Sequence, residues 1–347
     1  MRRANTSMRL GRQPGEVIDR SASFTFTWDG GTYSAYAGDT IVSALAAAGT
    51  RVFSRSLKYH RPRGLLTADF HDPGCLVQVG DEPNVRAAHR LVEPGMSVRP
   101  QGGWPSLRFD VKSANQLLGP VLSTGFYYKT FIKPRPLWPT YERVLRRFSP
   151  GGHIATTPPG GIYDQRHAHP DVLVAGGGPA GMAAAIAAAE AGARVLLVDE
   201  QHELGGHLRW GDAGDRDMLQ ALRAEVAAAD GIEVLSDAVV TGRYDGDLVA
   251  VLQRGLPHVT ERLVKARVRH LVIASGLIER PYVVTGNDLP GVMLSTAVRR
   301  LVNLYAVKPG QRAVVFTANA DGAAAAADLE RVGVQVCRVV DALHPGA

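Results

Sequence analysis

Alternating apolar and polar residues mark the first structured stretch of the chain. They occur over residues 23–28 (SFTFTW) and again over 32–36 (TYSAY), with Asp-Gly-Gly at 29–31 between them. Side chains alternate between the two faces of a strand, and glycines supply the positive φ of a tight turn, so the pattern predicts a β-hairpin. A helix is predicted next over 41–49, capped by the Asp-Thr pair before it and ended by a glycine. A hairpin followed by a helix is how a β-grasp, ferredoxin-like domain begins.

The later part of the chain changes to an α/β pattern. Residues 75–80 (CLVQVG) and 88–99 predict further strands of the β-grasp domain, whereas 103–168 is rich in proline and aromatic residues, with one predicted helix at 139–147. From residue 171 onward, strand and helix patterns alternate, as they do in Rossmann-type folds. The predicted strands are 171–175, 194–198, 232–236 and 269–274, and the predicted helices are 179–191 and 215–229.

The predicted fold class is therefore α/β with an α+β first domain. We expect a disordered tail over 1–21, a β-grasp 2Fe-2S-ferredoxin-like domain without cluster cysteines over 22–102, a linking segment over 103–168, a dinucleotide-binding Rossmann domain over 169–308, and the start of a second Rossmann unit over 309–347. That second unit has a strand–turn–helix–strand pattern but lacks the strands that would finish its sheet. We therefore expect it to be incomplete.

The sequence DVLVAGGGPAG over residues 171–181 carries the strongest functional signal. Gly176 permits a tight turn, Gly178 lets the backbone approach a pyrophosphate, and Gly181 allows close packing of helix on strand. The start of the helix offers free N–H groups and a positive dipole end to the diphosphate. Asp199, 18 residues after Gly181, ends the second strand and is placed to accept hydrogen bonds from ribose hydroxyls. An acid there repels a 2′-phosphate, so the motif predicts NAD or FAD rather than NADP.

Two other loops extend this picture. Gly205 and Gly206 follow the ribose acid and keep the next loop flat beside the dinucleotide, or they belong to a plain surface loop. Small residues at 274–276 end another buried strand, where backbone passes close to a cofactor or makes an ordinary turn. The turn of the second unit places Asn319 where a side chain would crowd a pyrophosphate. We expect poor or no nucleotide binding in that unit.

The reactive residues exclude several chemistries. The chain has two cysteines, Cys75 and Cys337. They form no disulfide framework, no C-x-x-C redox motif and no four-thiolate set for an iron–sulfur cluster. The 11 histidines show no metal-binding spacing, and no nucleophile–base pair is evident. The sequence therefore predicts neither a metal site nor a catalytic residue.

Charge and hydropathy limit the partners and the compartment. The net charge is +6, with basic clusters at 1–20, 51–63 and 142–147, but no aromatic-basic module for nucleic acid accompanies them. No stretch approaches the ~20 apolar residues of a membrane helix, and the start lacks the apolar region of a secretory signal. We expect no nucleic-acid partner, no membrane span and a reducing, cytoplasmic location.

Taken in order along the chain, these motifs resemble the N-terminal part of the α subunit of heterotetrameric sarcosine oxidase. The resemblance is carried by Gly38-Asp39-Thr40, the stretch Arg55–Gly64 (RSLKYHRPRG), Trp104-Pro105-Ser106-Leu107, Gly125–Phe131 (GFYYKTF), Arg166–His169 (RHAH) and the stretch from Gly176 to Leu208. It covers nearly the whole chain.

The resemblance implies a function in oxidative demethylation of sarcosine to glycine. It implies that the Rossmann unit holds NAD, with FAD in the same site as the alternative, and that FAD and a covalent FMN belong to the β subunit and the α/β interface. By resemblance, Ala180, Asp199, Glu200, Gln201, His207 and Val240 lie where the family contacts NAD. The implied partners are β, γ and δ subunits, and substrate oxidation takes place at flavin in another subunit.

The chain departs from this family in its length. It has nothing that corresponds to the family's folate-binding, aminomethyltransferase-like domain, so we expect a fragment, a truncated product or one piece of a split subunit. Two alternatives remain open. One is an independent FAD-dependent NAD(P)H oxidoreductase, and the other is a non-catalytic scaffold with an empty Rossmann site. The amine substrate rests on the resemblance alone.

Overall fold

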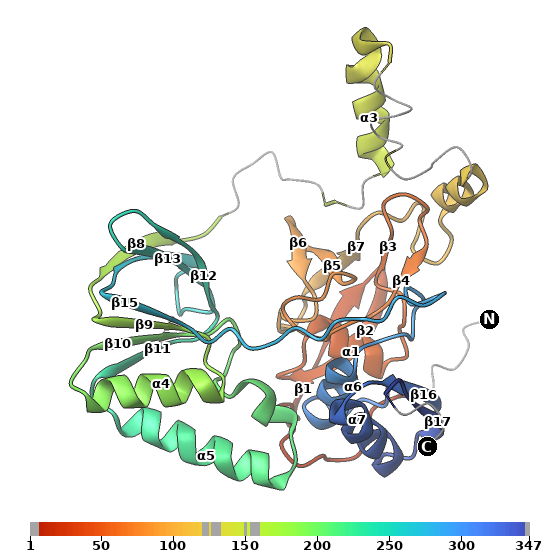
Figure 1. Cartoon of the computed structure of the whole chain (residues 1–347). Helices are drawn as coiled ribbons and strands as arrows, with labels where there is room; N and C mark the ends of the chain where they lie inside the picture. The colour runs from red at the N-terminus through yellow and green to blue at the C-terminus, as the bar shows by residue number, and fades with distance from the viewer. Residues whose placement is uncertain (1–6, 120–124, 126–132, 149–150, 153–159, 344–347) are drawn as a thin grey trace. The chain divides into compact units, whose positions relative to one another are not determined.

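The computed structural model describes residues 7–119, 125, 133–148, 151–152 and 160–343. The chain divides into two compact units. Unit 1 comprises Met1–Thr157 and Glu279–Ala347, and unit 2 is the continuous stretch Pro158–Ile278. The element labels in Figure 1 are used below.

Unit 1 contains the predicted β-grasp sheet. Its strands lie in the order β2-β1-β7-β5-β6, with β1 and β7 parallel and the other neighbours antiparallel. The bounds are β1 (Asp19–Trp28), β2 (Gly31–Ala37), β5 (Leu76–Val79), β6 (Glu82–Arg86) and β7 (Ser97–Pro100), with a short pair β3 (Ser54–Arg55) and β4 (Pro62–Arg63) beside them. The hairpin is confirmed, with Phe26 opposite Tyr33.

The predicted helix beside this sheet is also present. Helix α1 (Ile41–Ala47) begins after Thr40, whose side chain accepts a hydrogen bond from the Ser43 N–H in a capping box. Its apolar side chains enter the core of unit 1, where Phe26, Ile41, Leu45, Phe53 and Val77 are almost completely buried.

The N-terminal segment differs from the disordered tail expected over 1–21. Residues 1–6 lie outside the described part, but from residue 7 the backbone pairs with other segments of unit 1. The Leu10 N–H donates to Ala306 O at 2.7 Å, and the Val17 N–H donates to Leu304 O at 2.9 Å. Arg9 is seated on buried Asp39 through two hydrogen bonds. These hydrogen bonds hold the segment in place. Local sequence pattern could not predict them, because Arg9 and its partner Tyr305 are almost 300 residues apart.

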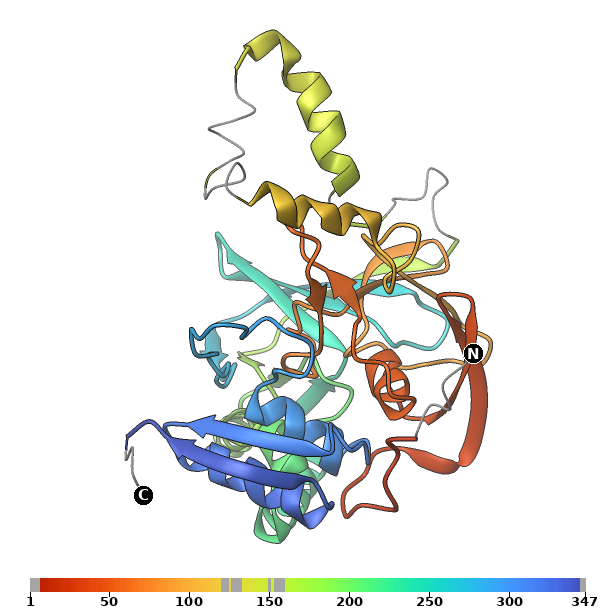
Figure 2. The same cartoon turned by 90° about the vertical axis from the view of Figure 1, so that its right-hand side faces the viewer.

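Residues 279–308, which we assigned to the Rossmann domain, group instead with unit 1. Helix α6 (Ser295–Asn303) inserts Ala297 and Leu301 into the same apolar core as α1. After it come β16 (Arg312–Thr317), α7 (Ala320–Arg331) and β17 (Gln335–Asp341), the β-α-β unit that the sequence predicted. The two strands are parallel and lie side by side (Figure 2).

The linking segment contains more helix than expected. The helix α3 (Trp138–Phe148) matches the predicted 139–147, and the 3-10 helices η1 (Val111–Leu118) and η2 (Arg135–Leu137) accompany it. Of the GFYYKTF motif, only Gly125 lies within the described residues.

Unit 2 is built from two sheets. The first is parallel, in the order β11-β10-β9-β15, and the second has the order β12-β13-β14-β8 (Figure 1). The bounds are β8 (Tyr163–Ala168), β9 (Val172–Ala175), β10 (Val195–Val198), β11 (Ile232–Leu235), β12 (Ala238–Tyr244), β13 (Leu248–Gln253), β14 (Glu261–Arg267) and β15 (His270–Ile273), with helices α4 (Pro179–Glu190), η3 (Gly206–Trp210) and α5 (Ala213–Ala228). The predicted strands and helices of the first sheet are all present.

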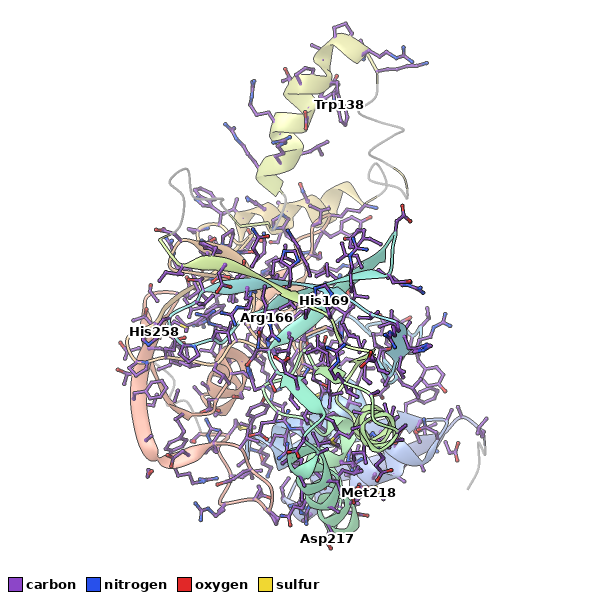
Figure 3. The ribbon with its side chains drawn as sticks, turned by 90° about the vertical axis from the view of Figure 1, so that its left-hand side faces the viewer. Trp138, Arg166, His169, Asp217, Met218 and His258 are labelled. Atoms are coloured by element: carbon purple, nitrogen blue, oxygen red, sulfur yellow. The ribbon has the colours of Figure 1, made fainter. Side chains whose placement is uncertain are left out.

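The second sheet of unit 2 was not anticipated. Strands β12, β13 and β14 form an antiparallel meander, and β8 pairs with β14 in parallel. The unit therefore begins before residue 169, because β8 lies in what we expected to be linking segment. Arg166 of β8, which is labelled in Figure 3, forms an ion pair with Glu233 of β11 at 2.5 Å. Apolar residues of both sheets, such as Leu196 and Val251, meet in one core, while α4 and α5 cover the other face of the parallel sheet.

Candidate dinucleotide site

The Gly-rich turn connects β9 to α4 at the carboxyl edge of the parallel sheet. Gly176 has φ +113°, which favours glycine, and a side chain there would collide with the Ala274 carbonyl of the neighbouring strand end. Its N–H donates to Val198 O at 2.8 Å, which ties the turn to β10. The turn therefore lies where parallel sheets bind ligands, at the carboxyl ends of adjacent strands.

Gly178 and Gly181 have different roles in this turn. A Cβ on Gly181 would overlap the Gly176 carbonyl, so only glycine lets α4 approach β9 this closely. Gly178 is the N-cap of α4, with φ −70°, and the nearest atom to an added Cβ is Gly206 Cα at 3.8 Å. Gly181 is thus required for packing, whereas a Cβ at Gly178 would make only an ordinary van der Waals contact and clash with nothing. Ala180 is exposed in the first turn of α4.

Asp199 lies at the end of β10, and its side chain is directed at the same turn. The residue is 8% exposed, and one carboxylate oxygen accepts the Gly177 N–H while the other accepts the Gln201 N–H at 2.7 Å. Each carboxylate oxygen thus accepts a backbone N–H. The structure therefore holds the charge in a fixed position next to the first glycines.

A second loop closes over the turn. The Gly205 N–H donates to Gly177 O at 2.8 Å. Gly206 has φ +53°, and an added Cβ would lie 3.0 Å from Gly178 Cα. Gly206 is thus favoured by the approach of two backbones as well as by its conformation, whereas a side chain at Gly205, with φ +131°, would collide with Leu219. Gly177 was not among the predicted site residues, although its place between the first two motif glycines marks it as a candidate.

The remaining predicted residues lie on either side of this pair of loops. The Gln201 side chain donates to Glu200 Oε1 at 3.2 Å, and His207 is exposed in η3. Val240 is half-buried in β12, which begins with Ala238, whose N–H donates to Asp199 O at 2.9 Å. The structure thus gathers the glycines, Ala180, Asp199 and Gln201 at the start of α4.

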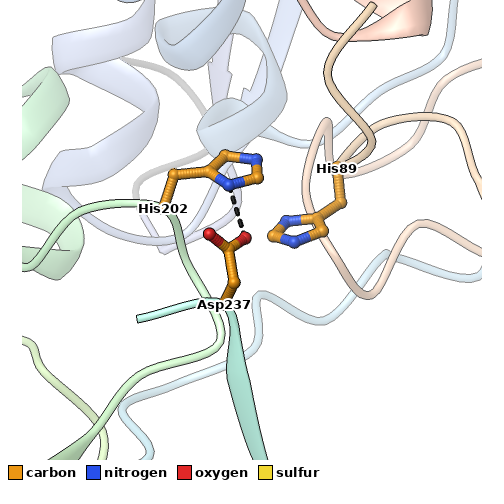
Figure 4. A group of neighbouring side chains, drawn as sticks. All are labelled: His89, His202 and Asp237. Atoms are coloured by element: carbon orange, nitrogen blue, oxygen red, sulfur yellow. Dashed lines mark ion pairs between the residues drawn. The ribbon is translucent and has the colours of Figure 1, made fainter. Parts of the chain in front are cut away.

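A contact between His202 and Asp237, at the carboxyl edge of the parallel sheet, was not predicted from the sequence. His202 Nδ1 lies 2.5 Å from Asp237 Oδ1 (Figure 4), and the Asp237 N–H donates to Gln201 O at 3.0 Å. The two interactions fasten the loop after β10 to the turn between β11 and β12. No local motif signals this pair, because the residues are 35 positions apart.

The opposite edge of the sheet carries structural charges. Asp171 precedes β9 and accepts the Arg194 N–H at 3.0 Å, and this hydrogen bond lowers the pKa of its carboxyl group. Asp171 therefore ties the starts of two strands together rather than facing a ligand.

The corresponding turn of β16-α7 is closed by its own side chain. Asn319 caps α7 by accepting the Asp321 N–H at 3.1 Å, and Gly322 packs against Thr317. The side-chain oxygen of Asn319 thus accepts the N–H group that would otherwise be available to a bound phosphate.

Two families match separate parts of the chain. Residues 21–103 match the 2Fe-2S iron-sulfur cluster binding domain family, and residues 171–253 match the FAD dependent oxidoreductase family. The second match spans the Gly-rich turn, both site loops and the strands β12 and β13.

Relatives align with nearly the whole chain. The sarcosine oxidase subunit alpha of Rhizobium meliloti is 41% identical over 94% of this chain, and that of Corynebacterium sp. strain P-1 is 35% identical over 97%. The chain is homologous to sarcosine oxidase subunit alpha. It spans about a third of the length of these relatives, 35% and 32% respectively. Its resemblance to this subunit is thereby confirmed for the matched portion.

A solved structure supports the fold of this alpha-subunit homologue. The L-proline dehydrogenase from P. horikoshii superposes with a TM-score of 0.63 over 95% of this chain and 56% of the other, at 19% identity. The predicted α/β class, with a ferredoxin-like domain and a Rossmann-type region, is confirmed. Among the described residues, no helix has the length and apolar character needed to span a bilayer.

The two implied cofactors differ in how well these residues fit them. A dinucleotide fits the turn, because the start of α4 has no side-chain cap on its N–H groups and its N-cap, Gly178, carries no side chain. A 2Fe-2S cluster does not fit residues 21–103, because ligation takes four thiolate or equivalent side chains and this stretch has Cys75 alone. Burial raises the pKa of the Cys75 thiol well above its usual range, which disfavours the thiolate that iron needs.

Proposed function

We propose that this chain is a dinucleotide-binding, alpha-type part of a sarcosine-oxidase-like oxidoreductase complex. It holds NAD at the turn between β9 and α4, and sarcosine is oxidised to glycine at flavin in another subunit. Gly176, Gly178, Ala180 and Gly181 cradle the pyrophosphate, Asp199 holds the ribose, and Glu200, Gln201, Gly205, Gly206, His207 and Val240 line the adenosine side. Further subunits, with FAD and FMN, complete the enzyme.

The observation that carries this proposal is the open N-cap of α4 beside a fixed carboxylate. The helix start supplies N–H donors without a side-chain cap, Gly178 puts no side chain over them, and Asp199 is held by Gly177 and Gln201 at the end of the adjacent strand. The groups brought together are backbone amides and one carboxylate. Such groups bind and orient a dinucleotide, and they leave bond-breaking to a cofactor or a partner.

The direct test identifies the nucleotide. We expect purified full-length protein to release NAD on acid denaturation, as detected by mass spectrometry, and to show a thermal upshift with NAD and ADP-ribose. Release of FAD would show that the ligand is FAD and not NAD, and would contradict that part of the proposal. Absence of any nucleotide, together with no upshift for NAD, ADP-ribose or FAD, would exclude dinucleotide binding by the isolated chain.

Gly178→Ala is expected to weaken NAD binding strongly while the protein stays folded. The new Cβ meets no protein atom closer than 3.8 Å and the φ of −70° suits alanine, so the melting temperature of ligand-free protein should be unchanged. The methyl group would occupy the space for the pyrophosphate, and we expect the Kd for NAD to rise at least about 100-fold, or about 2.7 kcal/mol. Calorimetric titration measures this. Wild-type affinity in this variant would place the pyrophosphate elsewhere.

The charge of Asp199 is expected to discriminate against NADP. Its carboxylate is buried and held by two N–H groups, so it cannot turn away from a 2′-phosphate. We expect NADP to bind at least about tenfold more weakly than NAD, a difference of about 1.4 kcal/mol. Equal Kd values for the two nucleotides in the same titration buffer would contradict the ribose role of Asp199.

A second candidate is an independent FAD-dependent NAD(P)H oxidoreductase. The match of residues 171–253 to the FAD dependent oxidoreductase family favours FAD in the same turn. Purified protein would then be yellow and would oxidise NADH without partner subunits. A colourless preparation without NADH oxidase activity would remove this candidate.

A further inference from the structure

The loop between β4 and β5 converges on one buried carboxylate. Asp72 is 3% exposed, and its Oδ2 accepts the N–H groups of three consecutive residues: Leu66 at 2.8 Å, Thr67 at 2.8 Å and Ala68 at 3.1 Å. The other oxygen accepts the Gly74 N–H at 2.9 Å. Successive N–H groups that point to one place form a concavity that binds anions.

In the part of the chain that the structure describes, backbone N–H groups meet the charge of this carboxylate. Among the described residues, no lysine, arginine or histidine forms an ion pair with Asp72. Its charge is therefore held by backbone N–H dipoles, the arrangement by which proteins also hold anionic inorganic groups. The conformation is specific, because Ala68 adopts φ +54°, a region that non-glycine residues seldom occupy.

The loop can be compared with a cluster loop through its one cysteine, Cys75. Plant-type 2Fe-2S domains bind iron through C-x4-C-x2-C and a more distant cysteine. When Cys75 is placed at the third cysteine, Asp72 falls at the second and Thr67 at the first. All three residues are buried, and Thr67 Oγ1 lies 3.5 Å from Asp72 Oδ2. The match of residues 21–103 to the 2Fe-2S domain family covers this stretch.

We propose that the Asp72 carboxylate is a built-in anion that takes the place of the iron–sulfur cluster in this domain. The N–H groups that would surround an anionic cluster surround the side chain of the chain's own residue. Unit 1 therefore folds and stays folded without iron, and it carries no electrons. This inference is independent of the ligand that occupies the turn at α4.

The proposal predicts that an external carboxylate can replace the internal one. Asp72→Ala leaves four N–H groups without acceptors, and we expect the melting temperature to fall by about 5–10 °C. Sodium formate should restore part of this loss, whereas formamide, a neutral molecule of the same shape, should not, at equal concentration and constant ionic strength. Wild-type protein and Asp19→Ala should show neither the loss nor the formate effect. Asp19 is the matched control, because its exposed carboxylate accepts two hydrogen bonds from Ser21.

Several results would overturn the proposal. They are an unchanged melting temperature in Asp72→Ala, equal recovery with formate and formamide, or no recovery with formate. Stoichiometric iron and acid-labile sulfide in wild-type protein expressed with added iron would do the same. If Asp72→Ala cannot be purified, Asp72→Asn keeps the size and removes the charge. Its melting temperature should fall more than that of Asp19→Asn, and equal values would refute the role of the charge.

Discussion

Replacing Arg9 with alanine is expected to lower the free energy of unfolding by about 3–5 kcal/mol, because it leaves a buried carboxylate without its cation. Arg9 donates to both oxygens of Asp39, at 2.7 and 3.1 Å, and Asp39 is completely buried. Arg9 also donates to Tyr305 O at 2.6 Å, so the same side chain links the N-terminal segment to the end of α6. Ser43 Oγ and the Tyr36 N–H remain as donors to Asp39, but neither carries a charge.

Arg12→Ala provides the matched control for this prediction. Arg12 lies on the same segment, but its side chain is 80% exposed and its partner Glu16 lies 3.5 Å away. Exposed pairs contribute about 0–1 kcal/mol, so Arg12→Ala should be almost neutral. Urea denaturation followed by circular dichroism measures both variants. Equal effects of the two substitutions would show that the buried pair does not hold the segment in place.

The second large effect is expected for Gly181→Ala, which should destabilise unit 2 by about 3 kcal/mol through overpacking. The added Cβ would overlap the Gly176 carbonyl and lie 3.4 Å from Ala274 Cβ, so α4 would have to move away from β9. Met182 and Ala185, which follow on the same helix, are completely buried against the parallel sheet and would lose part of that packing.

Gly178→Ala separates this effect from nucleotide binding. It adds the same methyl group three residues earlier on the motif, where no protein atom would clash with it. In ligand-free protein, Gly181→Ala should melt well below Gly178→Ala, and thermal unfolding followed by circular dichroism makes the comparison. Equal melting temperatures for the two variants would mean that the third motif glycine is not required by helix–strand packing.

The sequence of this chain predicted the elements whose signals are local. The hairpin strands predicted over 23–28 and 32–36 lie within β1 and β2. The helices α1, α4, α5 and α7 and the parallel strands β9, β10, β11 and β15 also appear where period and capping residues placed them. Side-chain period, turn glycines and N-caps act over a few residues, so they can be read without knowledge of the fold. The Gly-rich turn could also be predicted from local sequence. The structural roles of Gly176 and Gly181 follow from a strand, a tight turn and a helix in immediate succession.

Contacts between distant segments could not be predicted in this way. The antiparallel meander β12–β14 consists of short strands, and β8 joins its edge by pairing with a strand almost 100 residues later. The seating of Asp199 depends on Gly177, and the fastening of its loop depends on Asp237. The local sequence around each of these residues does not indicate which distant residue it will contact.

By itself, then, the sequence determined the α/β class, the dinucleotide turn with its acid, and the absence of enough cysteines for a cluster, because each rests on residue type and short spacing. Only the tertiary structure decided that residues 7–20 and 279–308 belong to the β-grasp unit, because Arg9 and α6 reach its core from opposite ends of the chain. The tertiary structure also decided which group takes the place of an iron–sulfur cluster. In the sequence, Asp72 looks like an ordinary loop residue. In the folded chain it is buried, and four N–H groups donate to its carboxylate.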